Sequence, residues 1–243
     1  MDNRIKKAFS VLIISCFITS CTSREINSAS MHGLRAGSLV SSASIKNTHL
    51  NEWFSYSEIP DNVWAEMQGK TYKENPYIQR DDLRYIKFLH HDFDGKVRVG
   101  EMICNKTIAK DLSEIFYELY LNNYQIERAF LPDFYDADDE KQMQANNSSS
   151  FCYRAVSGTN VLSNHAKGMA VDLNTFYNPY CKVRNDGSLF VQPKTAAQYC
   201  DRSSAFKHKI DKNDLAYKLF TKHGFSWGGD WKSVKDYQHF EKE

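Results

Sequence analysis

The most regular pattern of apolar side chains in the chain predicts a helix over residues 107–123. Apolar residues recur there four, seven and eight positions after the first, which places them on one face of a helix. That face comprises Ile108, Leu112, Ile115, Phe116, Leu119 and Tyr120. A second helix is expected over residues 212–223, with Asp211 as its N-terminal cap and Gly224 at its C-terminal end.

Two adjoining segments show the alternation that is typical of strands. Residues 83–93 and 97–104 lie on either side of a turn at Asp94-Gly95, so we expect a hairpin. Because strands and helices follow one another in groups rather than alternating, the pattern favours the α+β class. Shorter strands are expected over residues 125–131, 151–154 and 169–173, and short helical turns over 53–77.

The N-terminal residues predict export. Three basic residues within the first seven precede an apolar run over residues 8–18, as in a secretory signal, and the run is too short to span a bilayer. It ends in the letters ITSC, which resemble the bacterial lipobox, so we expect a signal peptide over 1–20 and a lipidated Cys21. A plain cleaved signal followed by an incidental cysteine is the alternative.

Composition separates a tether from a folded unit. Residues 22–50 are rich in Ser, Asn and Thr, which bury too little apolar surface to offset the entropy of ordering. We therefore expect a lipidated N-terminus and flexible tether over 21–50 and a single domain over 51–243. The 31 basic residues nearly balance the 30 acidic ones, which argues against a nucleic-acid partner.

Four cysteines remain after the signal peptide and Cys21 are set aside. In an oxidising compartment they permit two disulfides in three connectivities. Cys181 and Cys200 enclose a polar segment with an expected turn, so this pair is favoured, and Cys104 is then left with Cys152. A zinc site of all four cysteines is the alternative, but no two are spaced closely enough to favour it.

The candidate chemistry lies in two short segments. His165 precedes a glycine-bearing turn, and Asp172 follows in an apolar strand where an isolated charge is costly. The alternation over residues 236–241 places His239 and Glu241 on one face. Two imidazoles and a carboxylate form a ligand set that zinc accepts, with a fourth position left for water. Ordinary polar roles for both histidines are the alternative.

Several motifs in this order resemble a family of zinc peptidases. They are the S-x-H-x-x-G-x-A-x-D pattern over 163–172, the Asn-Pro pair at 178–179, the letters WGGDW over 227–231 and DYQHFE over 236–241. The family comprises D-Ala-D-Ala carboxypeptidases and L-Ala-D-Glu endopeptidases, and WGGDW is more similar to the endopeptidase branch of phage endolysins. Vancomycin-resistance D,D-peptidases and the hedgehog signalling domain share the fold, which implies a small central antiparallel sheet with helices packed on it.

The resemblance implies a role for individual residues. It makes His165, Asp172 and His239 the ligands of one zinc ion per chain and Asp236 the general acid/base. It also places Arg154 near the substrate carbonyl, where a positive charge stabilises the developing oxyanion. A surface or ion-paired arginine is the alternative for this residue.

Three further residues are candidates for substrate binding. Ser163 either hydrogen-bonds a ligand or the substrate or only shapes its turn, whereas Trp227 and Trp231 either line a cleft or pack in the core. Gly168 is expected to permit a close approach of two backbone segments.

The implied activity is hydrolysis of an amide bond in the peptide stem of peptidoglycan. We expect a monomeric lipoprotein, anchored in the outer membrane by its N-terminal lipid and facing the periplasm, because Thr22 follows Cys21 in place of the Asp of inner-membrane lipoproteins. A non-catalytic, zinc-bearing wall-binding protein of the same fold is the alternative from another functional class.

Overall fold

The structure, a computed structural model, describes residues 33–46, 49–156 and 159–243. The predicted signal peptide over 1–20, Cys21 and much of the predicted tether lie outside the described residues. None of the described helices is both long enough and apolar enough to cross a bilayer.

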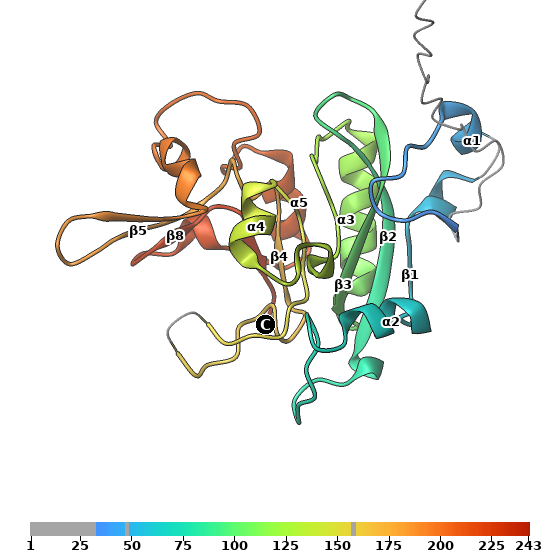
Figure 1. Cartoon of the computed structure of the whole chain (residues 1–243). Helices are drawn as coiled ribbons and strands as arrows, with labels where there is room; N and C mark the ends of the chain where they lie inside the picture. Colours follow the sequence, from blue (N-terminus) through green and yellow to red (C-terminus); the bar gives the residue numbers. More distant parts are fainter. Residues whose placement is uncertain (1–32, 47–48, 157–158) are drawn as a thin grey trace, which may run out of the picture.

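The first half of the domain is a hairpin sheet covered by one helix. Strands β1 (Ser55–Ser57), β2 (Leu83–His91) and β3 (Val97–Asn105) form an antiparallel sheet in that order. Helix α3 (Ala109–Leu121) lies along this sheet (Figure 1). The predicted hairpin and the predicted helix are both confirmed, and β1 is an addition that the sequence pattern did not indicate.

The apolar face of α3 forms the core with β2. The rings of Phe88 and Phe116 stack at 3.9 Å between centroids, and Leu112, Ile115 and Leu119 are buried around them. Full burial of such a side chain contributes about 1.5–3 kcal/mol relative to exposure, so this face accounts for much of the stability of the first half.

The second half consists of two smaller antiparallel sheets, so the single central sheet that the family resemblance implied is divided among three. One sheet has the order β4 (Ala170–Asp172), β9 (His239–Glu241), β7 (Ser226–Trp227). The other has the order β6 (Leu189–Gln192), β5 (Tyr180–Val183), β8 (Lys235–Asp236). Figure 1 shows β5 and β8 at the end of the molecule opposite α1 (Ser42–Lys46). Small antiparallel sheets with separate helices agree with the α+β class.

Short helices connect these sheets. The α-helices are α2 (Asp61–Met67), α4 (Asp139–Gln144) and α5 (Leu215–Lys222). The 3₁₀ turns are Leu50–Trp53, Arg80–Asp82, Pro132–Tyr135, Lys194–Cys200 and Gly228–Asp230.

Helix α5 begins later than its pattern predicted. Asp214, rather than Asp211, is the N-cap, and its side chain accepts a hydrogen bond from Ala216 N at 2.8 Å. Asp211 instead accepts from Asn213 N in the preceding turn, since an aspartate can stabilise either kind of local structure. The helix ends before Gly224, whose φ of 83° confirms the predicted end.

Two predicted strands are irregular. Residues 125–131 form only isolated bridges, to His91 and Asn147, and residues 151–154 form only single backbone hydrogen bonds, to β3 and His165 among others. The buried side chains of Asn147 and Asn174 bind backbone groups of the first segment and replace part of a strand ladder. An apolar run does not reveal such side-chain partners.

The two predicted disulfides have different outcomes. Cys181 and Cys200 are linked, as predicted. The predicted Cys104–Cys152 bond is wrong, because both cysteines are free and buried. Cys104 belongs to the apolar core that contains α3, whereas Cys152 is buried but is not part of that core.

The folded unit extends upstream of the predicted boundary at residue 51. Leu34 is buried in the core, and Gly37 N donates to Val99 O at 2.8 Å. Arg35 Nε lies 3.1 Å from Glu101 Oε1, and the Glu101 side chain is 1% exposed. At least residues 34–46 therefore belong to the domain rather than to a flexible tether.

Removal of this upstream segment should destabilise the domain. A chain of residues 51–243 lacks Leu34 and leaves Glu101 buried without Arg35, so we expect its free energy of unfolding to fall by roughly 3 kcal/mol, or about 5–10 °C in Tm, relative to residues 33–243. Thermal unfolding of both chains measures the difference, and Arg35→Ala in the longer chain should reproduce part of it. Equal Tm values would show that the segment contributes no stability.

Candidate functional site

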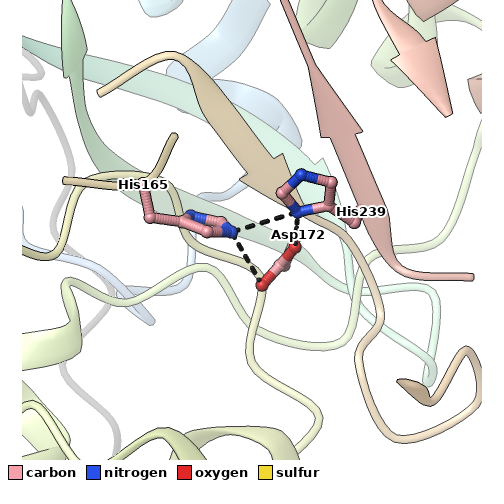
Figure 2. A group of neighbouring side chains, drawn as sticks. All are labelled: His165, Asp172 and His239. Carbon is pink, nitrogen blue, oxygen red and sulfur yellow. Dashed lines mark hydrogen bonds and ion pairs between the residues drawn. The ribbon is translucent and has the colours of Figure 1, made fainter. Parts of the chain in front are cut away.

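The pairing of β4 with β9 brings two of the candidate ligands together. Asp172 lies directly across from His239 in the antiparallel register, and His165 approaches from the turn before β4 (Figure 2). His165 Nε2 lies 3.2 Å from His239 Nδ1 and 3.2 Å from Asp172 Oδ2, and His239 Nδ1 lies 3.1 Å from Asp172 Oδ1. One donor atom of each residue therefore faces a common centre.

A tight turn holds His165 in position. Gly168 has a φ of 69°, and its carbonyl accepts a hydrogen bond from Asn105 N at 2.8 Å at the end of β3. A Cβ at residue 168 would lie 2.6 Å from that same nitrogen, so the predicted close approach requires glycine. Ser163 Oγ accepts from Ala166 N at 3.1 Å, which gives Ser163 the turn-shaping role that was one of its two predicted roles.

The outer nitrogen of each imidazole is bound to an acceptor. His165 Nδ1 lies 2.6 Å from Ser150 O, and His239 Nε2 lies 3.0 Å from Glu241 Oε2. A carbonyl or carboxylate oxygen accepts hydrogen bonds only, so a neutral ring keeps its proton on the outer nitrogen and directs the lone pair of the inner nitrogen toward the cluster. Metal-binding histidines in proteins are oriented in this way.

The donor spacing fits a small divalent cation. Zinc bonds of 2.0–2.1 Å in a tetrahedral site place ligand atoms roughly 3.3 Å apart, close to the 3.1–3.2 Å that separates these donors. Two imidazole nitrogens and a carboxylate oxygen also match the ligands that zinc prefers. The residues present therefore fit the cofactor that the family resemblance implies.

A second group of potential ligands is less suited to a cation. Asp111, Glu114 and His223 offer donor atoms near one another on α3 and at the end of α5. However, Lys242 Nζ lies 2.7 Å from Asp111 Oδ2, so the protein already supplies a positive charge there.

Opposing effects set the charges of Asp172 and His239. Burial disfavours ionisation of Asp172, but the imidazoles of His165 and His239 outweigh it and hold the pKa of Asp172 well below its usual range. Burial also opposes the charge on His239, yet hydrogen bonds to Asp172 and Glu241 raise the pKa of His239 above its usual range. Without a metal ion, a proton on His239 therefore offsets part of the negative charge of Asp172 and Glu241.

Asp236 reaches the same cavity from a different sheet. β8 ends at Asp236 and β9 begins at His239, and this interruption supplies the bend that the odd spacing of the two residues required. Burial and the Asp172 carboxylate raise the pKa of Asp236. Gly228 packs beside it, and a Cβ there would lie 2.5 Å from Asp236 O and 3.2 Å from His239 Cβ.

The remaining predicted residues divide between the cavity and the core. Arg154 and Trp231 line a cavity of about 700 Å³ that also contains the metal-ligand candidates. Arg154 Nε lies 2.8 Å from Asp139 Oδ2, and the ring of Trp231 lies 5.2 Å from that of His239. Of the two roles predicted for Trp227, the structure shows the core role, because its ring is buried in the core and Nε1 donates to Tyr237 O.

Sequence reasoning missed two supporting residues. Glu241 Oε2 holds the outer nitrogen of His239 and also accepts from Asn164 Nδ2 at 2.6 Å. The alternation over 236–241 had placed Glu241 on the same face as His239, so the signal was present but had no role assigned. The interaction of Asn164 with Glu241 spans 77 positions and left no local pattern.

The geometry agrees with a comparison to known families. Residues 157–242 match the family model described as D-alanyl-D-alanine carboxypeptidase. The predicted family resemblance is thereby confirmed over this segment, which contains His165, Asp172, Asp236 and His239. Arg154 lies upstream of the matched residues. No solved structure was found to match the chain.

Metal binding to the site formed by His165, Asp172 and His239 should release a proton. The raised pKa of His239 stabilises the metal-free protein fully below about pH 6.5, and this contribution is lost as the pH rises through the raised value. Zinc must displace that proton, so its affinity should fall as the pH falls. Titration calorimetry at neutral pH in buffers of different ionisation enthalpy should detect about one proton released from His239.

A matched pair of histidine variants controls this measurement. His239→Ala should abolish zinc binding, whereas His49→Ala should not change it, because His49 is exposed and outside the cluster. A zinc affinity that is equal at about pH 6 and about pH 8 would contradict the proposed proton on His239.

Proposed function

We propose that this protein is a zinc-dependent peptidase that hydrolyses an amide bond in the peptide stem of peptidoglycan. The observation that carries the proposal is the position of Asp236, which lines the same cavity as the three spaced donors His165, Asp172 and His239. All four belong to the segment that matches a D-alanyl-D-alanine carboxypeptidase family. We also propose that the domain has the hedgehog-type fold of this family.

His165, Asp172 and His239 would hold the zinc ion, which supplies Lewis acidity and lowers the pKa of a bound water toward about 7. The carboxylate of Asp236 takes the proton of the attacking water and then passes it to the leaving amine. A raised pKa suits both steps, because a group that titrates nearer neutrality can accept a proton and release it again.

Arg154 would stabilise the negative charge that develops on the substrate carbonyl oxygen. Its guanidinium lines the cavity and is held by the Asp139 carboxylate at the start of α4. Because guanidinium stays charged at all relevant pH values, this contribution does not depend on proton transfer.

Two stem bonds are candidates. A D-Ala-D-Ala carboxypeptidase removes one terminal alanine, whereas an L-Ala-D-Glu endopeptidase releases a peptide from the muramyl lactyl-alanine. The WGGDW segment favours the endopeptidase. Digestion of purified muropeptides and mass measurement of the products distinguish the two reactions.

A non-catalytic, zinc-bearing wall-binding lipoprotein is the second candidate function. The same cluster would then have only a structural role. Asp236 favours the enzyme, because a partly buried carboxyl with a raised pKa beside a metal site is costly and contributes nothing to a purely structural zinc site.

Asp236→Asn should separate catalysis from metal binding. Asn keeps the size of the side chain but cannot accept the proton, so we expect kcat for stem hydrolysis to fall by about 10²–10⁴ while the variant retains about one zinc per chain. Asp230→Asn is the matched control, because Asp230 is exposed and pairs with Lys212 outside the cavity. Full turnover by Asp236→Asn would remove its proposed role, and native protein that binds wall but cleaves no stem would favour the non-catalytic function.

We also propose that the protein is a monomeric lipoprotein anchored to the periplasmic face of the outer membrane. The basic N-terminus, the apolar run over 8–18 and the ITSC letters support this location, which would place the peptidase beside its peptidoglycan substrate.

Cys21→Ser tests the lipid anchor. Without the acylated sulfur the protein should move from the membrane fraction to the soluble fraction or remain unprocessed, while muropeptide hydrolysis by the purified protein is retained. Cell fractionation with detection of the protein measures the change. A variant that still fractionates with membranes after processing would contradict the anchor.

A further inference from the structure

One wall of the cavity is a hairpin whose residues the proposed chemistry does not use. Strands β5 and β6 pair with Lys182 opposite Phe190 and Tyr180 opposite Gln192. Because side chains alternate along a strand, these four residues share one face of the hairpin with Arg184, and all five line the cavity. We call this set the hairpin face.

The hairpin face presents two cations to the cavity. In the part of the chain that the structure describes, no acidic side chain lies within ion-pair distance of Lys182 or Arg184. The Asp186 carboxylate in the hairpin turn instead accepts hydrogen bonds from Ser188. Arg154, on the same cavity, differs because Asp139 already neutralises it. The hairpin cations are therefore available to a ligand.

An aromatic ring orients one of these cations. The guanidinium carbon of Arg184 lies 4.8 Å from the ring centroid of Phe190. A cation–π contact of this kind holds the plane of the guanidinium and leaves its N–H groups free to donate. Two parallel N–H donors match the two oxygens of a carboxylate.

The position of the hairpin face relative to Asp236 is fixed by covalent and backbone bonds. Tyr180 in β5 pairs with Asp236 in β8, and the neighbouring Cys181 is bonded to Cys200. A ligand on the hairpin face therefore lies at a set distance from the proposed general base. Such preorganisation reduces the entropy lost on binding.

The cavity also has an uneven distribution of charge. Asp172, Asp236 and Glu241 line the cavity near the two histidines, whereas Lys182 and Arg184 belong to the β5–β6 hairpin. The part of this hairpin labelled β5 projects from the molecule in Figure 1. An extended peptide bound with its scissile amide at the metal centre would place a neighbouring residue against the hairpin face. A negative group on that residue would be attracted there, because among the described residues no acidic side chain lies within ion-pair distance of either hairpin cation.

We propose that the hairpin face, chiefly Lys182 and Arg184, binds a free carboxylate of the substrate peptide away from the scissile bond, so that the enzyme selects acidic stem peptides over amidated ones. This inference rests on the proposed function. A glutamate within a stem has two carboxyl groups and uses one of them in the chain, so its other carboxyl is free to be recognised.

Kinetics with two synthetic stem peptides tests the proposal. The peptides differ only at the glutamate, which carries either a free carboxylate or a carboxamide. For the native protein, KM should be lower for the acidic peptide. In the Lys182→Ala/Arg184→Ala variant, KM for the acidic peptide should rise roughly tenfold, which corresponds to the loss of about one charge-assisted hydrogen bond, with a much smaller change for the amidated peptide.

Further variants separate a specific role from a general loss of charge. Lys222→Ala is the matched control, because Lys222 is exposed at the end of α5 and does not line the cavity. The Lys182→Arg variant should retain part of the selectivity for the acidic peptide, because the positive charge remains. The Lys182→Glu variant should reverse that selectivity. The selectivity of the native protein should weaken at high salt, and thermal unfolding should show that the double variant remains folded.

The outcomes distinguish this inference from the proposed function. If both peptides are cleaved with the same KM ratio by the native protein and the double variant, the peptidase function stands and the role of the hairpin face is refuted. If neither peptide is cleaved by the zinc-loaded native protein, the proposed function fails and the inference fails with it.

Discussion

The candidate site depends on the register between β4 and β9. Asp172 faces His239 across the two strands, and the preceding pair, Val171 and Phe240, points into the core. A shift of one residue would exchange these faces and bury the ligands while exposing the apolar pair. Phe240 stacks on Phe220 of α5 at 4.3 Å, so the packing of α5 holds the register that the ligands require.

The high density of charged groups in this site limits the ligands that it can bind. Asp172, Asp236 and Glu241 are partly buried and lie around two buried imidazoles in one cavity. Carboxylates that share one site raise each other's pKa, and unpaired buried charges are costly. Without a metal ion, a proton on His239 relieves part of this repulsion, and Asp236, whose pKa is raised to about 6, takes up a proton only below neutral pH. A divalent cation would relieve it more fully and release Asp236 to act as a base.

The regular elements of the fold could be predicted because their signals are local. The α3 pattern and the β2–β3 alternation reflect burial of a single face, and that burial decides their structure. The segment over 125–131 could not be predicted, because side-chain amides from distant residues complete its hydrogen bonds. The upstream residues around Arg35 have a tether-like composition, yet the buried Glu101 requires their charge.

In the candidate site, too, some residues could be predicted from the sequence and others could not. His165, Asp172, Asp236 and His239 were identifiable because their motifs are short and occur in a recognisable order. The role of Trp227 could not be decided from its motif, since a tryptophan beside glycines suits a cleft or a core equally. Likewise Cys104 and Cys152 were assigned to each other by elimination, a procedure that contains no information about distance.

Two metal-ligand candidates and the proposed general base lie on different sheets. The chain passes from one sheet to the other at Tyr237 and Gln238. The metal-ligand candidates His239 and Asp172 belong to the β4–β9–β7 sheet, whereas Asp236 belongs to β8, which pairs with β5 of the β5–β6 hairpin. Two side-chain contacts stabilise the chain where it passes between the sheets. The guanidinium carbon of Arg202 lies 4.2 Å from the ring centroid of Tyr237, and Gln238 Nε2 donates to Asp236 Oδ1 at 3.1 Å.

This division assigns different tasks to the two sheets. One sheet would hold the cation, and the other would hold both the base and the wall that contacts the substrate, with Cys181–Cys200 bracing that wall. Because the base and the hairpin face share β5 as a neighbour, a peptide that fits the hairpin is placed relative to Asp236 before any movement of the metal ligands is needed. Substrate selection can therefore change on β5 and β6 while the metal centre on β4 and β9 stays the same.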